Sequence, residues 1–252
     1  MSDDVQPEGP EPPRHSPPTS DTWRRVDAYL TDALVGHDPD LEAAIAAQHA
    51  AGLPDIEVAP TGGKLLHLLA RATGACRVLE IGTLGGYSTI WLARGIPPGG
   101  RVVTIEAEPA HAAIARQSID RAGVGEMVEI RTGRAADVLP TLIGEDPFDL
   151  VFIDADKEST TIYLDWAARL GRLGAAVVVD NVVRGGRIVD PADRSTQVEG
   201  VRAGLAMLAG DPRFDATALQ SFDAKGWDGI AIALVVEPST PEPSDAEAIK
   251  VD

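Results

Sequence analysis

The spacing of apolar positions changes near residue 77, from a helical period to short apolar runs that alternate with helical segments. Three helices are expected before that point. The first follows the capping pair Ser20-Asp21, the second is the alanine-rich stretch 39–51, and the third opens at 60–63. The apolar residues at helical spacing are Trp23, Val26, Tyr29 and Leu30 in the first helix, and Leu65, Leu66, Leu68 and Leu69, which mark the buried face, in the third.

Strands and helices alternate from residue 77 onward. The expected strands are 77–81, 101–105, 127–131, 149–153 and 175–179, and the helices between or after them are 87–94, 109–122, 134–142, a segment carrying Tyr163 to Trp166, and 196–208. Apolar, β-branched runs of this kind are typical of strands buried on both faces of a parallel sheet. The alternation predicts an α/β fold with a right-handed, doubly wound, mostly parallel sheet. Two last runs, near 215–221 and 229–236, predict a hairpin that closes one sheet edge.

Acidic residues stand where two of these strands end. The strand 149–153 is followed by Asp154-Ala-Asp156-Lys157, and the strand 175–179 is followed by Asp180-Asn181. Ligands of open α/β sheets bind outside the carboxyl ends of the strands. Two adjacent strands with these ends would bring three oxygen ligands into one crevice, which is a hypothesis for a metal site at Asp154, Asp180 and Asn181. The alternative is that the two aspartates only cap the helices that follow.

A glycine-containing turn, Gly82-Thr-Leu-Gly85-Gly86, follows the first strand. It lacks the dinucleotide spacing G-x-G-x-x-G, which disfavours a pyrophosphate site. Glu80 would suit an ammonium or sulfonium group, and Glu106, at the end of the second strand, stands where nucleoside-binding folds accept hydrogen bonds from ribose hydroxyls. A nucleoside without a diphosphate is expected, and S-adenosylmethionine (SAM) fits that description. The alternative for Glu80 and Glu106 is that they are ordinary acids at strand ends. The alternative for Gly85 and Gly86 is that they serve only the packing of the helix on the strand.

Composition narrows the class of protein. The 252 residues carry a formal net charge of -17, and 44% of them are hydrophobic. No basic cluster offsets that charge, so neither nucleic acid nor an anionic membrane is an expected partner, and no apolar run is long enough to span a bilayer. The acidic, proline-rich ends 1–20 and 238–252 have the composition of disordered tails, which leaves 21–237 as one domain. The single Cys76 allows no intrachain disulfide, makes the cytoplasm the default location, and is expected to be a buried, inert thiol.

Three motifs in order carry a resemblance to a known family. They are Val78-Leu-Glu-Ile-Gly82 with Gly86-Tyr-Ser88, then Phe152-Ile-Asp-Ala-Asp-Lys157, then Val179-Asp-Asn181. Together with Asp228-Gly-Ile-Ala-Ile-Ala233 they resemble the cation-dependent O-methyltransferases of the catechol and caffeoyl-CoA type over residues 50–236. The chain departs from that family at Ser159 and Thr160, where relatives usually carry Asn and an aromatic residue. This departure bears on the acceptor pocket or on local helix packing.

The resemblance implies a class I methyltransferase fold, SAM as cofactor, and Mg²⁺ or another divalent cation such as Mn²⁺ or Ca²⁺. It implies metal ligation by Asp154, Asp180 and Asn181, catalysis by Lys157, and a small phenolic or catechol substrate. A homodimer is also implied. The implied cofactor-site residues are Val58, Glu80, Gly82, Thr83, Ser88, Glu106, Ala135 and Asp154.

Two other readings stay open from the sequence. One is a nicotinamide-dependent oxidoreductase, which the glycine spacing disfavours, and the other is a non-catalytic nucleoside-binding protein. Tyr163 and Trp166 are expected in the helix core rather than as a substrate platform. His37, His49, His67 and His111 show no metal-ligand spacing, and no Gly-x-Ser-x-Gly elbow supports serine hydrolysis.

Overall fold

The computed structural model describes residues 20–237. The predicted tails 1–20 and 238–252 lie outside the described residues, except for Ser20, where the first helix begins. The strands are β1 (Arg77–Ile81), β2 (Arg101–Glu106), β3 (Val128–Thr132), β4 (Phe148–Ile153), β5 (Gly171–Asp180), β6 (Phe214–Asp223) and β7 (Gly226–Val235). The α-helices are α1 (Ser20–Leu30), α2 (Pro39–Ala50), α3 (Pro60–Ala72), α4 (Tyr87–Gly95), α5 (Pro109–Arg121), α6 (Ala135–Val138), α7 (Thr160–Leu170) and α8 (Thr196–Gly210).

The seven strands form one sheet in the order β3-β2-β1-β4-β5-β7-β6. The strands β3, β2, β1, β4 and β5 are parallel, whereas β7 runs antiparallel to both β5 and β6. The predicted α/β class, the doubly wound sheet and the C-terminal hairpin are therefore confirmed. The chain winds outward from β1 to β3 and then returns to β4 on the other side of β1. The winding direction thus reverses between β1 and β4, which is where such sheets bind ligands.

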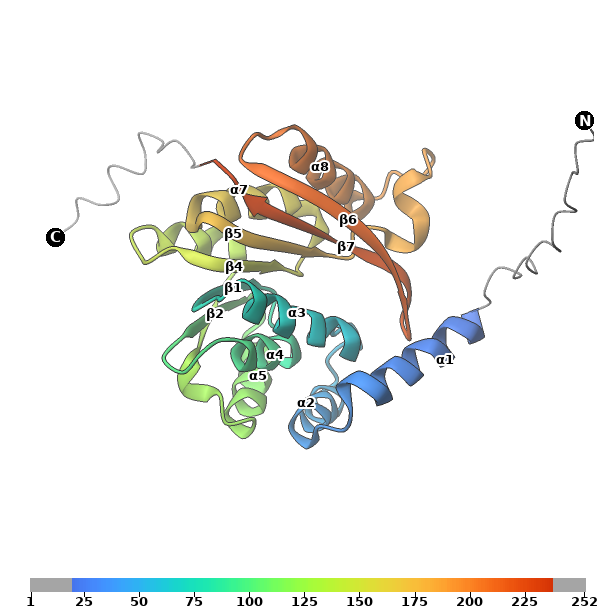
Figure 1. Ribbon diagram of the computed structural model, residues 1–252, viewed down its shortest axis with the longest axis vertical. Helices are drawn as coiled ribbons and strands as arrows, with labels where there is room; N and C mark the ends of the chain where they lie inside the picture. The colour runs from blue at the N-terminus through green and yellow to red at the C-terminus, as the bar shows by residue number, and fades with distance from the viewer. Residues whose placement is uncertain (1–19, 238–252) are drawn as a thin grey trace, which may run out of the picture.

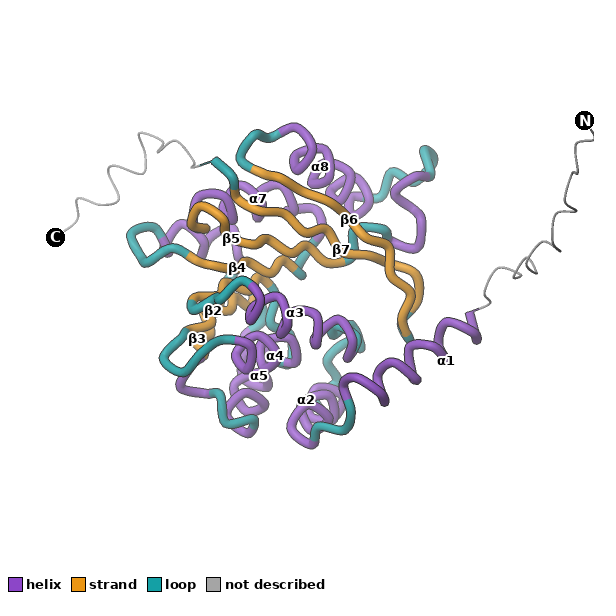
Figure 2. Tube along the Cα trace, viewed as in Figure 1, coloured by secondary structure: helices purple, strands orange, loops and turns teal. Residues whose placement is uncertain are grey.

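Helices cover both faces of the sheet (Figures 1 and 2). Side chains of α2 to α5 share one core cluster with Val78, Val102 and Val178, and side chains of α6 to α8 share the other with Leu79, Val103 and Val177. Successive strand residues point to opposite faces, so a continuously apolar strand is the sequence that two covered faces require. Within residues 20–237, no helix is both long and apolar enough to cross a bilayer.

The strand register lines up the carboxyl ends of the central strands. Ile81 pairs with Ile153 across β1 and β4, and Ile153 pairs with Val179 across β4 and β5. The residues that follow these strands therefore start level with one another. This register brings the glycine turn after β1, the Asp154 segment and the Asp180 segment to a common edge.

Three details differ from the sequence prediction. The buried face of α3 is formed by Gly63, Leu66 and Ala70, whereas Leu65 and Leu68 are exposed. Small residues are needed there because α4 lies so close that a Cβ atom on Gly63 would fall 2.3 Å from the Trp91 ring. The predicted helix 134–142 is α6 followed by a 3₁₀ turn, η3 (Leu139–Leu142), because Pro140 lacks the N–H that an α-helix needs. Cys76, predicted to be buried, is exposed.

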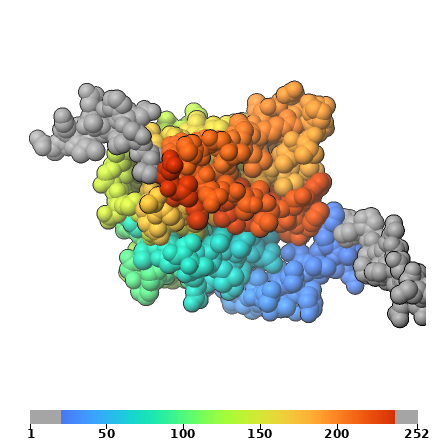
Figure 3. Space-filling view, turned by 45° about the horizontal axis from the view of Figure 1, so that its top comes forward, coloured from blue at the N-terminus to red at the C-terminus, as the bar shows by residue number. Residues whose placement is uncertain are grey.

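The C-terminal hairpin reaches the N-terminal helix. In the space-filling view the hairpin, orange to red, spreads across one face of the molecule and its tip meets the blue N-terminal segment (Figure 3). The rings of Trp23 in α1 and Phe222 in β6 lie 4.9 Å apart. Asp27 of α1 accepts hydrogen bonds from the Ala224 backbone N–H at the tip and from the Thr61 hydroxyl of α3. Segments far apart in the sequence are thereby joined beside the strand ends.

Candidate active site

A cavity of about 660 Å³ lies at the carboxyl ends of the parallel strands. Its walls include the ends of β1, β2, β4 and β5, the start of α4, α6, and the loop 54–58 between α2 and α3. The volume and position are those of a small-molecule site. The predicted site residues that line it are Val58, Gly82, Thr83, Ser88, Glu106, Ala135, Asp154, Lys157 and Asn181. Glu80 and Asp180 do not line the cavity and lie behind its wall.

The glycine turn brings backbone to the cavity surface. Gly82 has φ 99, and a Cβ atom there would lie 2.0 Å from the carbonyl oxygen of Asp154. Only glycine meets both conditions, because side-chain-bearing residues rarely adopt this backbone and the neighbouring atom is main chain. Leu84, two residues after Gly82, also has positive φ. Gly86 has positive φ as well, but it packs against Ala115 and Ile119 of α5, so this glycine serves the start of α4 and its packing on α5.

Glu106 holds the glycine turn in place. One carboxylate oxygen accepts the backbone N–H groups of Thr83 and Leu84, at 3.2 and 2.8 Å, and the other accepts that of Glu108. His111 of α5 approaches the same carboxylate at 3.5 Å. A carboxylate has about four lone-pair sites, so Glu106 keeps acceptor capacity toward the cavity that it lines. Its position fits the predicted role with ribose hydroxyls.

Glu80 is fully buried rather than exposed to ligand. Its carboxylate accepts hydrogen bonds from the hydroxyls of Ser88, Thr89 and Thr104. Burial raises the pKa of Glu80 to about 7, and these hydroxyls oppose the rise. The carboxylate therefore ties β1 to β2 and α4 behind the glycine turn. Its route to any ligand in the cavity is through Ser88, which lines the wall.

The predicted metal ligands meet at the level edge of β4 and β5. Burial raises the pKa of Asp180 to about 7, and the neighbouring carboxylate of Asp154 adds to the rise. Asn181 has φ 60, a left-handed conformation that asparagine tolerates better than most residues. Two crowded carboxylates and one amide oxygen are the donor set that a hard divalent cation takes in proteins. The residues present fit such an ion.

Lys157 is the cation nearest to these acids. Its ammonium group lies 2.8 Å from Asp154 Oδ1, and the residue is 8% exposed. Its backbone is fixed from two sides. The hydroxyl of Thr160 donates to the Lys157 carbonyl, and α8 packs so closely that a Cβ atom on Gly200 would lie 2.1 Å from that oxygen. Lys157 is therefore held in position at the cavity wall.

Ser159 and Thr160, where the chain departs from the family pattern, are well packed. Ser159 and Tyr163 both donate hydrogen bonds to the Asp156 carboxylate. Burial alone would raise the pKa of Asp156, but these two hydroxyls hold it below its ordinary value. Thr160 is buried against Gly204 of α8. Local helix packing is thus intact, and Tyr163 serves both the core, as predicted, and the cavity wall.

The loop 54–58 lines one side of the cavity and is held in place by the C-terminal hairpin. Lys225, at the turn between β6 and β7, donates to the carbonyl of Glu57 and lies 2.9 Å from its carboxylate. Gln48 of α2 donates to the same carboxylate. His49, Asp55 and Glu57 gather their ligand atoms within 4.8 Å, but Lys225 already supplies a cation to this group.

Sequence reasoning missed several lining residues. Arg184, Gln197, Ile56 and His111 line the cavity although no motif marks them. Arg184 and Gln197 come from the connection after β5 and from α8, and Ile56 comes from the loop before α3. Their spacing in the sequence gives no signal because only the tertiary structure brings these segments together. Positive φ at Arg184 is visible only in the structure.

Comparison with known proteins places these features in a family. The O-methyltransferase family model matches residues 40–234. A catechol O-methyltransferase of Mycobacterium tuberculosis is 58% identical over 210 residues, covering 83% of this chain and 94% of that protein. A catechol O-methyltransferase of Niastella koreensis is 48% identical over 215 residues, covering 84% and 97%. The crystal structure of the O-methyltransferase TomG from Streptomyces achromogenes, in complex with SAM, superposes with a TM-score of 0.83 at 49% identity, covering 86% of this chain and 99% of that one.

The fold is that of a Rossmann-like methyltransferase. Its sheet is doubly wound and ends in an antiparallel hairpin, and its cavity lies beside a glycine turn that lacks the dinucleotide spacing. The chain belongs to the O-methyltransferase family and is a SAM-dependent O-methyltransferase. The predicted resemblance is confirmed. The readings as a nicotinamide-dependent oxidoreductase and as a non-catalytic binding protein are set aside.

Proposed function

We propose that this enzyme transfers a methyl group from SAM to one hydroxyl of a vicinal-diol aromatic molecule. The transfer depends on a divalent cation, for which Mg²⁺ is the first candidate. The observation that carries the proposal is that Asp154, Asn181 and Lys157 line a cavity that also carries the glycine turn, with the Asp180 carboxylate close enough to interact with Asp154 and Lys157. Two similar proteins named catechol O-methyltransferase support the substrate class.

The cofactor would occupy the end of the cavity formed by β1, β2 and α6. Gly82 and Thr83 allow close approach of backbone, and Glu106 accepts hydrogen bonds from the ribose hydroxyls. Ala135 and Val58 supply apolar contact on either side. Ser88 lines the same end and is held by Glu80. These contacts direct the methyl group toward Asp154 and Lys157.

In the reaction, an acceptor oxygen attacks the methyl carbon while the carbon–sulfur bond breaks, and S-adenosylhomocysteine leaves. A free phenol has a pKa near 10 and is mostly protonated at neutral pH. A divalent ion held by Asp154, Asp180 and Asn181 would lower the pKa of the bound hydroxyl. Lys157 would take the released proton as general base once a divalent ion on Asp154 has replaced its ion pair and its amine is neutral. The fixed backbone of Lys157 keeps its amine close to the attacking oxygen, and alignment of this kind supplies much of the rate.

Methyl transfer from SAM to catechol, followed by mass spectrometry of the product, tests the proposal. Treatment with EDTA should abolish turnover, and added Mg²⁺ should restore it. SAM binding, measured by calorimetry in EDTA, should persist, which separates loss of the metal from loss of the cofactor. Undiminished turnover after chelation would refute the role given to Asp154, Asp180 and Asn181.

The remaining parts of the sequence interpretation stay predictions. They are the homodimer, the cytoplasmic location, the single domain 21–237, and the absence of nucleic-acid and membrane partners. Size-exclusion chromatography with light scattering tests the first of these directly.

A further inference from the structure

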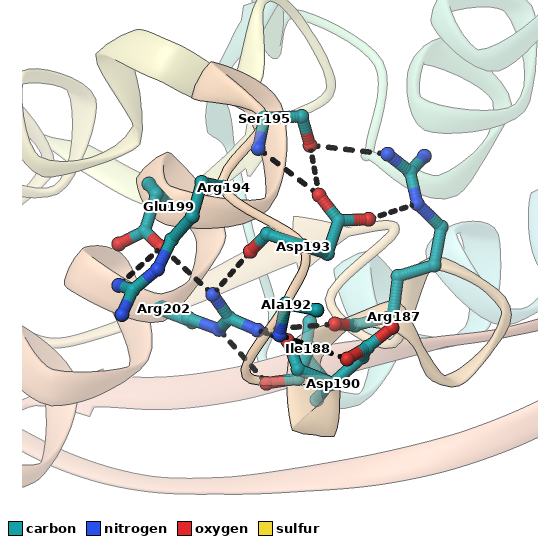
Figure 4. Close-up of polar contacts among 9 residues, drawn as sticks. All are labelled: Arg187, Ile188, Asp190, Ala192, Asp193, Arg194, Ser195, Glu199 and Arg202. Carbon is teal, nitrogen blue, oxygen red and sulfur yellow. Dashed lines mark hydrogen bonds and ion pairs between the residues drawn. The ribbon is translucent and has the colours of Figure 1, made fainter.

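The connection between β5 and α8 is braced along its length (Figure 4). Arg202 of α8 donates to the backbone carbonyls of Arg187, Ile188, Asp190 and Asp193. Arg187 forms an ion pair with Asp193 and also donates to the Ser195 hydroxyl. One arginine that satisfies four carbonyls fixes a segment that has little regular structure of its own. The residues that begin this connection are therefore held in a defined position.

The start of the connection is also seated on β7. The Asp228 carboxylate accepts the backbone N–H groups of Val183 and Arg184, at 3.0 and 2.9 Å. Gly186 lies so close to the Trp227 ring that a Cβ atom would fall 2.6 Å from it. Within this turn Arg184 adopts φ 56, a conformation unfavourable for a residue with a long side chain. The fold thus holds an arginine where the backbone would favour glycine.

Arg184 follows Asn181 by three positions and lines the same cavity as Asp154, Lys157 and Asn181. One terminal nitrogen donates to Gln197 Oε1 at 2.7 Å, but the buried Nε has no hydrogen-bond partner. Among residues 20–237, no carboxylate lies within ion-pair distance of this guanidinium. Lys157, the buried cation of the wall, is paired with Asp154. A guanidinium has five N–H donors and is always charged, so most of its binding capacity is unused.

We infer that Arg184 binds an anionic group of the acceptor, and that the preferred acceptors are catechols bearing a ring carboxylate. The inference rests on the proposed function, because it places the diol of the same molecule at the metal ligands. Guanidinium and carboxylate match in geometry and form strong, charge-assisted hydrogen bonds. A protein of net charge -17 otherwise repels an anionic substrate, so a local unpaired cation is the feature that recognition requires. Gln197 orients the guanidinium for this contact.

The test compares two acceptors that differ only in charge, dihydroxybenzoate with vicinal hydroxyls and its methyl ester. The wild-type enzyme should show a KM for the acid below that for the ester. Arg184→Gln should raise the KM for the acid about 10- to 100-fold, as expected for loss of hydrogen bonds to a charged group. The kcat of the variant should stay near the wild-type value, because the lost contact stabilises the bound acceptor and the transition state equally. The ester should react as in the wild type, and Arg184→Lys should recover part of the affinity for the acid.

Arg194→Gln is the matched control, since it removes one positive charge from the same connection at a side chain that is 75% exposed. It should leave both acceptors unchanged. A variant Arg184→Gln that weakens acid and ester equally would overturn the inference, because it would indicate a structural role for Arg184. Equal use of both acceptors by the wild type would also overturn it. If neither acceptor nor catechol itself is methylated, the proposed function fails and the inference fails with it.

Discussion

The two ends of the cavity are built in different ways. At the proposed cofactor end the wall is formed by backbone and strand-end residues of β1 and β2, which are neighbours in the sheet and nearly so in the sequence. At the proposed acceptor end the wall is formed by residues of the connection after β5, of α8 and of α7, which only the tertiary structure brings together. A cofactor that is the same for every relative can be held by shared backbone geometry, whereas an acceptor is selected by side chains on loops. A substitution at one end of the cavity should therefore impair the binding or chemistry of that end and leave the other end unaffected.

Asp180→Asn is expected to give the largest difference between the effect on turnover and the effect on SAM binding. Loss of one carboxylate from the proposed metal site should lower kcat roughly 10³-fold or more. SAM affinity should remain within about twofold of wild type, because Asp180 does not line the cofactor end. Calorimetry with SAM and single-turnover methyl transfer give the two values. Asp146→Asn, at an exposed residue, serves as the control, and a parallel loss of SAM binding would break the division into two ends.

Lys157→Met should lower kcat about 10²-fold or more, the usual contribution of a general base. The KM for SAM should not change. The effect should shrink at high pH, where the acceptor loses its proton without help. A pH–rate comparison of the variant and the wild type measures this, and a variant with an unchanged rate across the whole range would remove Lys157 from the mechanism.

Gly82→Ala acts where the two ends touch, because Gly82 approaches the carbonyl of Asp154. The added Cβ atom meets main chain at 2.0 Å, so both SAM affinity and turnover should fall, the former about tenfold. Gly99→Ala is the matched control, since Gly99 also has positive φ but has no atom within 4 Å of the added Cβ. That variant should cost only about 1–2 kcal/mol of stability and no activity. Similar effects of the two substitutions would mean that backbone strain alone, and not close approach, explains Gly82.

The last prediction concerns stability rather than activity, and it leaves both ends of the cavity unchanged. Because burial raises the pKa of Glu80 from 4.5 to about 7, the folded state binds this proton more tightly than the unfolded state. The free energy of unfolding should be insensitive to this group below pH 4.5, fall by about 1.4 kcal/mol per pH unit between the two pKa values, and level off above the higher one. Glu80→Gln should flatten that part of the profile in thermal or urea unfolding, while Glu126→Gln, at an exposed residue, should not. If the slope were unchanged in Glu80→Gln, the pH dependence of the free energy of unfolding in this range would come from another group.

The same contrast explains what the sequence could reveal. The placement of Asp154, Asp180 and Asn181 after neighbouring strands, at one edge of the sheet, was predictable because a continuous apolar strand shows where it ends and parallel strands end at one edge. The position of Arg184 was not predictable, because it depends on Trp227 and on Asp228, which lies 44 residues later in the sequence. The leucines of α3 misled the helix-face prediction because α4 packs on the small residues Gly63 and Ala70 instead. Glu80 was assigned to the ligand because its strand position was clear, while the three hydroxyls that enclose it come from α4 and β2.

Lys225 fastens the loop 54–58 from a hairpin that is almost the last part of the described chain. During synthesis on a ribosome, the strands that hold the cofactor emerge first, but one side of their cavity lacks its fastening until residue 225 has left the exit tunnel. We expect a nascent chain that ends before the hairpin to retain SAM poorly even when its parallel strands have formed. Tight cofactor binding would then report that the hairpin has folded onto the rest of the domain.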